Sequence, residues 1–183
     1  MGFKFHGKIL DREVVVMIGT AATHNFISKE LVDELQIPVE RTRSYRVDYG
    51  VGGSEAKGAE VCNNVVVETH GIEIIQRFFP IKLGIADVVL GSEWLECLDT
   101  FTMESGPTIH SGRTMLISFE WLGQRVTLQS DPSLTKGLEM GFVMLQWDDD
   151  DGDDDERSCS KEGGAELCNE KEKEEHEEQE TVI

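Results

Sequence analysis

Hydrophobic and polar residues alternate over short segments along most of the first 130 residues, a period of two that predicts β-strands. The first such segments lie on either side of a turn at residues 10–13. The second segment becomes an unbroken apolar run over residues 14–18, which predicts a strand buried on both faces. Small residues follow from Gly19 to Thr23, and they predict a tight loop at the end of this strand.

Three further pairs of segments predict β-hairpins. Residues 45–49 and 59–61 flank a glycine-rich tip, residues 65–69 and 72–79 flank a turn at 70–71, and residues 113–120 and 124–129 flank residues 121–123. A short apolar strand is expected over residues 87–92. The chain is therefore predicted to be mainly β, with a closed sheet or small barrel.

Two short helices interrupt this pattern. The first is expected over residues 29–36, with Asn25 or Ser28 as its N-cap and an acidic residue in its first turn. Ser92 is the expected cap of the second helix, which carries Trp94, Leu95 and Leu98 inward. Neither helix changes the fold class.

Charge is spread unevenly along the 183 residues. Residues 148–183 hold 17 acidic and 4 basic residues, a net charge of -13, whereas residues 1–147 hold 19 and 13, a net charge of -6. The final segment is predicted to be a disordered acidic tail, because it cannot bury enough apolar surface to offset its ordering entropy. The acidic body excludes a nucleic-acid surface on charge alone.

The four cysteines have no spacing typical of a metal site, and no cofactor motif is present. The sequence has no signal-peptide pattern and no apolar run of the roughly 20 residues that span a bilayer. These features predict an intracellular protein, cytoplasmic or nuclear, with no metal, no cofactor and no membrane association.

The order of these motifs resembles the retropepsin-like aspartic protease domain of Gypsy-type LTR retrotransposon polyproteins. Such domains carry an apolar pair followed by Asp-Ser/Thr-Gly-Ala-Thr, often continuing His-Asn-Phe-Ile-Ser. Met17-Ile18 is similar to the apolar pair, and residues 22–28 are similar to the continuation. The resemblance covers roughly residues 3–134 and implies the small closed barrel of that family.

The resemblance also implies roles for individual residues. The tip residues Gly50, Val51, Gly52 and Gly53 correspond to the flap that closes over substrate, and Val89, Leu90 and Gly91 correspond to the strand that supports the active-site loop. It implies a protease-like domain at 1–104 and a β-hairpin connector at 105–134. Outside the resemblance, composition predicts a linker at 135–147 and the tail at 148–183. A homodimer and an extended peptide in the cleft are the partners that the resemblance implies.

The catalytic Asp of the family corresponds to Gly19, which has no side chain to accept a proton. Aspartic proteolysis needs two facing carboxylates that share one proton, one from each subunit in this family. Thr20 keeps the hydroxyl that braces the two loops, whereas Ala21 replaces a glycine where backbones pack closely. The favoured interpretation is a retropepsin-like domain that is catalytically inactive.

Several alternatives remain. A displaced carboxylate could restore an active aspartic endopeptidase, or the acidic tail could be the working part as an interaction segment. His24 beside the loop could form a Ser/Thr–His pair, although an ordinary hydrogen bond is the preferred interpretation. Asp87 could be taken for a second catalytic Asp, but a structural role at the start of a strand is preferred.

Overall fold

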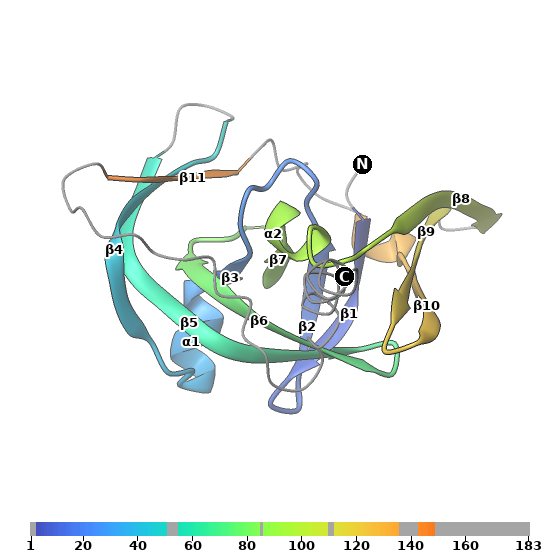
Figure 1. The fold of residues 1–183 in the computed structure, drawn as a ribbon, viewed down its shortest axis with the longest axis horizontal. Helices are drawn as coiled ribbons and strands as arrows, with labels where there is room; N and C mark the ends of the chain where they lie inside the picture. Colours follow the sequence, from blue (N-terminus) through green and yellow to red (C-terminus); the bar gives the residue numbers. More distant parts are fainter. Residues whose placement is uncertain (1–2, 51–54, 85, 110–111, 136–142, 149–183) are drawn as a thin grey trace, which may run out of the picture.

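The structure is a computed structural model that describes residues 3–50, 55–84, 86–109, 112–135 and 143–148 (Figure 1). Its main strands are β1 (Phe3–Ile9), β2 (Arg12–Ile18), β3 (Phe26–Ser28), β4 (Glu40–Asp48), β5 (Glu55–Thr69), β6 (Ile72–Ile81), β7 (Val88–Leu90), β8 (Phe101–Ile109), β9 (Gly112–Trp121), β10 (Gln124–Gln129) and β11 (Met144–Trp147). Two short α-helices, α1 (Lys29–Leu35) and α2 (Ser92–Leu95), and the 3-10 helix η1 (Pro132–Thr135) complete the described elements.

Six strands close into a barrel in the order β1-β2-β7-β3-β6-β5. The ring closes because β1 also pairs with β5, through Lys8 and Glu68. The apolar run predicted over residues 14–18 lies in β2, between β1 and β7, so both edges of this strand are hydrogen-bonded. The expected mainly β fold with a small closed barrel and two short helices is confirmed.

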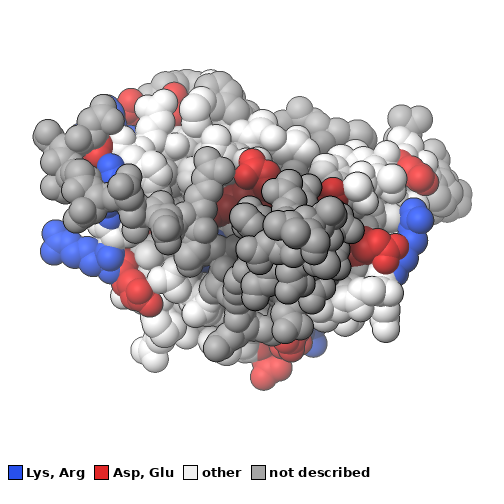
Figure 2. Space-filling model, in the orientation of Figure 1, with Lys and Arg blue, Asp and Glu red and all other residues white. Residues whose placement is uncertain are grey.

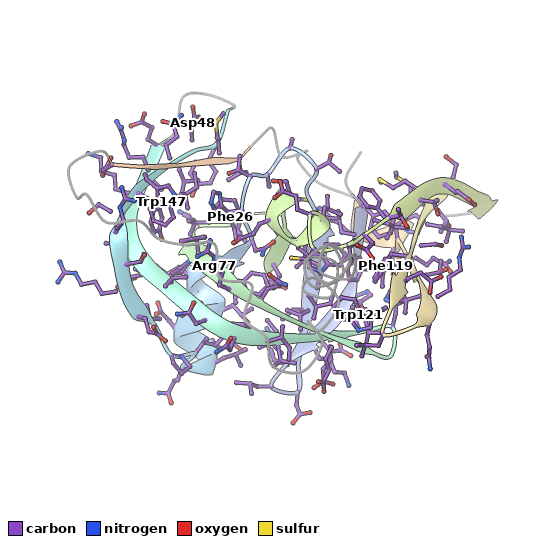
Figure 3. All side chains as sticks on the ribbon, in the orientation of Figure 1. Phe26, Asp48, Arg77, Phe119, Trp121 and Trp147 are labelled. Atoms are coloured by element: carbon purple, nitrogen blue, oxygen red, sulfur yellow. The ribbon has the colours of Figure 1, made fainter. Side chains whose placement is uncertain are left out.

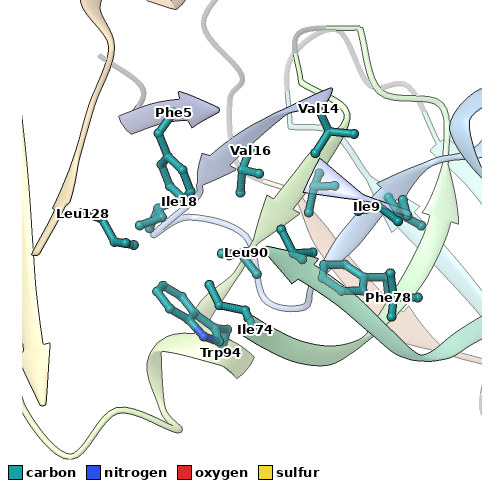
Figure 4. Close-up of a cluster of buried hydrophobic side chains, with 14 of the residues drawn as sticks. Phe5, Ile9, Val14, Val16, Ile18, Ile74, Phe78, Leu90, Trp94 and Leu128 are labelled. Atoms are coloured by element: carbon teal, nitrogen blue, oxygen red, sulfur yellow. The ribbon is translucent and has the colours of Figure 1, made fainter. Parts of the chain in front are cut away.

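A three-stranded sheet, β10-β9-β8, lies at the opposite end of the molecule from β4 and β11 (Figure 1). The predicted hairpin over residues 113–129 is formed by β9 and β10, and the expected boundary at residue 104 falls inside β8. Ile117, Phe119 and Leu128 of this sheet belong to the same buried cluster as the barrel residues. Figure 4 shows Leu128 beside Phe5 and Ile18, so the sheet packs directly on the barrel.

The helices lie close to the predicted positions; one of the two predicted caps of the first helix is confirmed, and the predicted cap of the second is wrong. Ser28 caps α1, with its hydroxyl accepting from the Leu31 amide at 3.4 Å, while Asn25 is used elsewhere. Gly91, and not Ser92, is the N-cap of α2, and no side chain caps that helix. Ser92 is instead the first residue of α2.

Residues 144–147 form the strand β11, although the sequence predicted them to be part of a linker at 135–147. This strand pairs antiparallel with β4, from Met144 opposite Asp48 to Trp147 opposite Tyr45. Buried Val143 and Leu145 join a second hydrophobic cluster on the β4 side of the barrel. The predicted acidic tail lies outside the described residues from residue 149 onward.

Candidate functional site

The loop that follows β2 begins at Gly19 and is held by backbone hydrogen bonds. The Gly19 amide donates to the Leu90 carbonyl at 3.0 Å, and the Ala22 amide donates back to the Gly19 carbonyl at 2.9 Å. The first bond anchors the loop to β7, and the second closes a tight turn. Thr20 and Ala21 between them are exposed, so the Ala21 methyl meets no crowding from the described residues of its own chain.

Gly19 occupies a confined position. A Cβ placed there lies 3.0 Å from Val89 Cγ1 and 3.2 Å from Ala22 Cβ, while the Gly19 φ is outside the left-handed region. The Val89 methyl can move with its side chain, whereas the Ala22 Cβ moves only with its backbone, so an added side chain needs a small local shift. The φ of Gly19 itself is one that an L-residue adopts.

The residues predicted to support the loop, Val89, Leu90 and Gly91, are all buried at its back. Val89 lies between Met17 of β2 and Phe26 of β3 and is fully buried. A Cβ at Gly91 would meet the His24 carbonyl oxygen directly, so only glycine fits here without a backbone shift.

Asn25 is a site residue that sequence reasoning missed, because a polar residue beside a helix start first suggests a cap. Its side chain is fully buried, and its Oδ1 accepts from the Gly91 amide at 2.9 Å. Its Nδ2 lies 3.4 Å from both Gln76 Oε1 and Glu93 Oε2. Asn25 therefore holds the end of β7 against the loop.

A partly buried ion pair extends this support. Arg77 Nε lies 2.6 Å from Glu93 Oε1, and the second oxygen of Glu93 faces the Asn25 amide at 3.4 Å. At the start of α2, the Ser92 hydroxyl donates to the Thr23 carbonyl at 2.9 Å. These contacts involve residues far apart in the sequence, and no local pattern marks them.

The predicted flap corresponds to the hairpin of β4 and β5. Gly50 at its tip has φ +64, a conformation that favours glycine, and its amide donates to Asp48 Oδ1 at 2.8 Å. Val51, Gly52 and Gly53 lie outside the described residues.

The hydrogen bonds to the loop from Gly19 to Thr23 come from backbone groups, the Ser92 hydroxyl and the His24 ring, and the loop sequence contains no carboxylate. Asp87 is used structurally, because its Oδ2 accepts from the Val15 amide at 2.7 Å. His24 Nδ1 lies 2.9 Å from the Thr23 hydroxyl, an ordinary hydrogen bond. Among the described residues, no group of three or more His, Cys, Asp or Glu side chains is placed to hold a metal ion.

Four rings form what we term the aromatic cluster beside the loop: His24, Tyr45, Phe79 and Trp147. Tyr45 and Phe79 have ring centroids 5.1 Å apart, and Trp147 lies 5.7 Å from Phe79. Burial raises the pKa of Tyr45 to about 12, although its hydroxyl donates to the Glu60 carbonyl. Figure 3 shows Trp147 on the same side of the molecule as Asp48, so the cluster lies beside β4.

Figure 2 shows one face of the molecule. On the described part of that face, Lys and Arg side chains form small separate groups among Asp and Glu side chains. Within the described residues, no helix is long and apolar enough to cross a membrane.

The sequence profile of the retroviral aspartyl protease family matches residues 8–103, more than half of the 183-residue chain. The chain therefore belongs to the retroviral aspartyl protease family, and its barrel with two short helices is a retropepsin-like fold. Among solved structures, the chain is similar to the crystal structure of the retroviral protease-like domain of Ddi1 from Leishmania major, with 17% identity and a TM-score of 0.41. That similarity covers 52% of this chain and 76% of the other. No curated protein matches the chain.

Proposed function

We propose that this chain is a catalytically inactive, retrotransposon-derived retropepsin-like domain that retains the frame of a peptide-binding cleft. The observation that carries the proposal is Gly19, the first residue of the loop. Its amide is bound to the Leu90 carbonyl, and it has no side chain that could supply a carboxylate. Peptide binding between loop and flap uses backbone hydrogen bonds and side-chain pockets, neither of which needs the missing Asp.

The chemistry explains why one residue decides activity. One carboxylate of the dyad takes a proton from water, and the other donates a proton to the peptide carbonyl oxygen. A homodimer of this chain would bring two Gly19 residues together and would place no proton acceptor at the centre. Exposed Thr20 remains available to brace two loops in such a dimer, which analytical ultracentrifugation can detect.

The test compares the parent chain with Gly19→Asp and with Gly19→Asp/Ala21→Gly, on a peptide library between acidic and neutral pH. We expect the parent to leave the library intact and the double variant to cleave it in a pepstatin-sensitive manner. An added Cβ at position 19 meets only side-chain atoms of Val89 and Ala22 at its two nearest contacts, and no backbone atom. Pepstatin-sensitive turnover by the parent would show that the chain is an active aspartic endopeptidase.

A matched control variant tests whether any restored cleavage depends on the carboxylate at position 19. Gly19→Asn/Ala21→Gly has nearly the same volume as the Asp variant but cannot act as a carboxylate base, and it should not cleave the library. Equal activity of the Asn and Asp variants would reject a restored dyad as the source of cleavage.

A further inference from the structure

The segment Val143–Asp148 lies between the loop and the first strand of the predicted flap. On one edge, the Val143 amide donates to the Ala21 carbonyl at 3.2 Å, and the Thr23 amide donates to the Val143 carbonyl at 3.0 Å. On its other edge, β11 pairs antiparallel with β4. The segment is thus a strand hydrogen-bonded on both sides, which is how an extended peptide would be held between loop and flap.

Side chains of the segment alternate between the interior and the solvent. Val143 is fully buried and Leu145 is 6% exposed, and both belong to the hydrophobic cluster that also contains Val47. Trp147 enters the aromatic cluster, whereas Gln146 is exposed. The cleft therefore accepts apolar side chains at alternate positions of a strand. Val143 and Leu145 occupy the first two of these positions, and the ring of Trp147 occupies the third.

The hydroxyl of Thr23 adds a contact specific to this strand. It accepts a hydrogen bond from the Leu145 amide at 3.0 Å, across 122 positions of sequence. Together with the two backbone bonds to Val143, this contact fixes the register of the segment on the loop.

An ion pair and a backbone hydrogen bond hold the C-terminal end of the segment, at Asp148, on β4. Arg46 Nε lies 2.9 Å from Asp148 Oδ1, and the Asp148 amide donates to the Ser44 carbonyl at 3.0 Å. The Arg43 guanidinium lies 5.6 Å from the Trp147 ring centroid, a cation–π contact.

We propose that residues 143–148 are an internal pseudosubstrate: a strand of the chain itself that occupies the peptide cleft and competes with external peptides. This inference rests on the proposed peptide-binding function and adds its regulation and ligand class. The ligand is an extended peptide with apolar residues at alternating positions, the third aromatic, followed by an acid. A tethered strand competes at an effective concentration of about a millimolar, so an external peptide binds well only after the strand is displaced.

The first experiment locks the strand in place by a disulfide. Arg46 and Gln146 are exposed partners in the β4–β11 register, and facing residues of antiparallel strands have the Cα separation that a disulfide needs. The variant Arg46→Cys/Gln146→Cys is made in the full chain with Cys97, Cys159 and Cys168 changed to serine. Binding of a fluorescent peptide with the sequence of residues 141–148 is measured by anisotropy, oxidised and reduced.

The second experiment releases the strand in the full chain by Leu145→Asp, which places a charge among buried apolar side chains. We expect this chain to bind the peptide about tenfold or more tightly than the parent, and the oxidised lock to bind none. A peptide that itself carries Leu145→Asp is the matched control and should not bind. Hydrogen exchange of β4 should rise in the released chain, while its barrel strands stay protected.

The outcomes separate the two proposals. Peptide binding by the oxidised lock that is as tight as binding by the released chain overturns the pseudosubstrate, and it leaves the peptide-binding domain standing. Binding of library peptides but not of the 141–148 peptide by the released chain also overturns it. If a released and folded chain binds no peptide from the library, peptide binding itself is rejected.

Discussion

Single residues decide how the loop sits on the barrel. Gly91 has the His24 carbonyl directly against the position of a Cβ, and the Ala22 carbonyl oxygen lies 2.8 Å from that position. Its own amide donates to the buried Asn25 side chain. A glycine at this point lets β7 approach the loop closely enough for the Leu90 carbonyl to hold Gly19.

Gly91→Ala should therefore be strongly destabilising. The added methyl would meet backbone atoms that cannot rotate away, and the expected loss is about 3 kcal/mol or more in the free energy of unfolding. Urea denaturation measures this loss, and Gly84→Ala is the matched control because nothing lies within 4 Å of its added Cβ. Similar stabilities of the two variants would contradict the close approach.

At the scale of elements, α1 depends on its first turn. Ser28 has extended backbone angles, and its hydroxyl both accepts from the Leu31 amide and donates to Glu30 Oε2 at 2.9 Å. The backbone amide of Glu30 and the Ser28 hydroxyl lower the pKa of the Glu30 carboxyl. A seven-residue helix is too short to be stable alone, so its cap and its buried Leu31 and Val32 hold it on β3.

Ser28→Ala should cost about 1 kcal/mol of stability, because the Leu31 amide in the first turn of α1 loses its side-chain acceptor. Thermal and urea unfolding of the full chain report this change. The exposed Ser44 is a suitable control, and Ser44→Ala should leave the unfolding midpoint nearly unchanged. Equal midpoints for Ser28→Ala and the parent would mean that the cap contributes nothing.

At the scale of the whole molecule, a few polar contacts join the three-stranded sheet to the barrel in addition to their shared core. His70, in the β5–β6 turn, accepts from the Gln129 amide at the end of β10 through Nε2 at 3.3 Å. Its ring also packs edge-on against Phe5, with centroids 5.6 Å apart. Burial lowers the pKa of His70 below its ordinary value of 6.5.

This lowered pKa predicts a pH dependence of stability. The unfolded chain binds the proton more tightly than the folded chain, so stability is complete above about pH 6.5 and declines as the pH falls through the folded pKa. Urea midpoints at about pH 7.5 and 5.5 should differ more for the parent than for His70→Asn. Asparagine suits the control because position 70 has φ +47, which Asn adopts readily. An unchanged pH difference in His70→Asn would rule out this residue as the source.

Local patterning was sufficient for much of the fold. The alternation of apolar residues predicted the β1–β2, β5–β6 and β9–β10 hairpins, and the Ser28 cap with its apolar face predicted α1. The order of motifs indicated the family that the profile match shows. These features depend on residues within one hairpin or one helix, where spacing alone determines which side chains meet.

Tertiary structure decided what lies against the loop. Asn25 braces Gly91, Glu93 pairs with Arg77, and Thr23 accepts from Leu145, and each of these contacts joins separate elements. The sequence predicted only a linker over residues 135–147, because alternation defines a strand but not the edge that it joins. The sequence alone predicts that Gly19 stands at the catalytic position of the family. Only the folded chain brings the distant strand β11 against the loop that begins at Gly19.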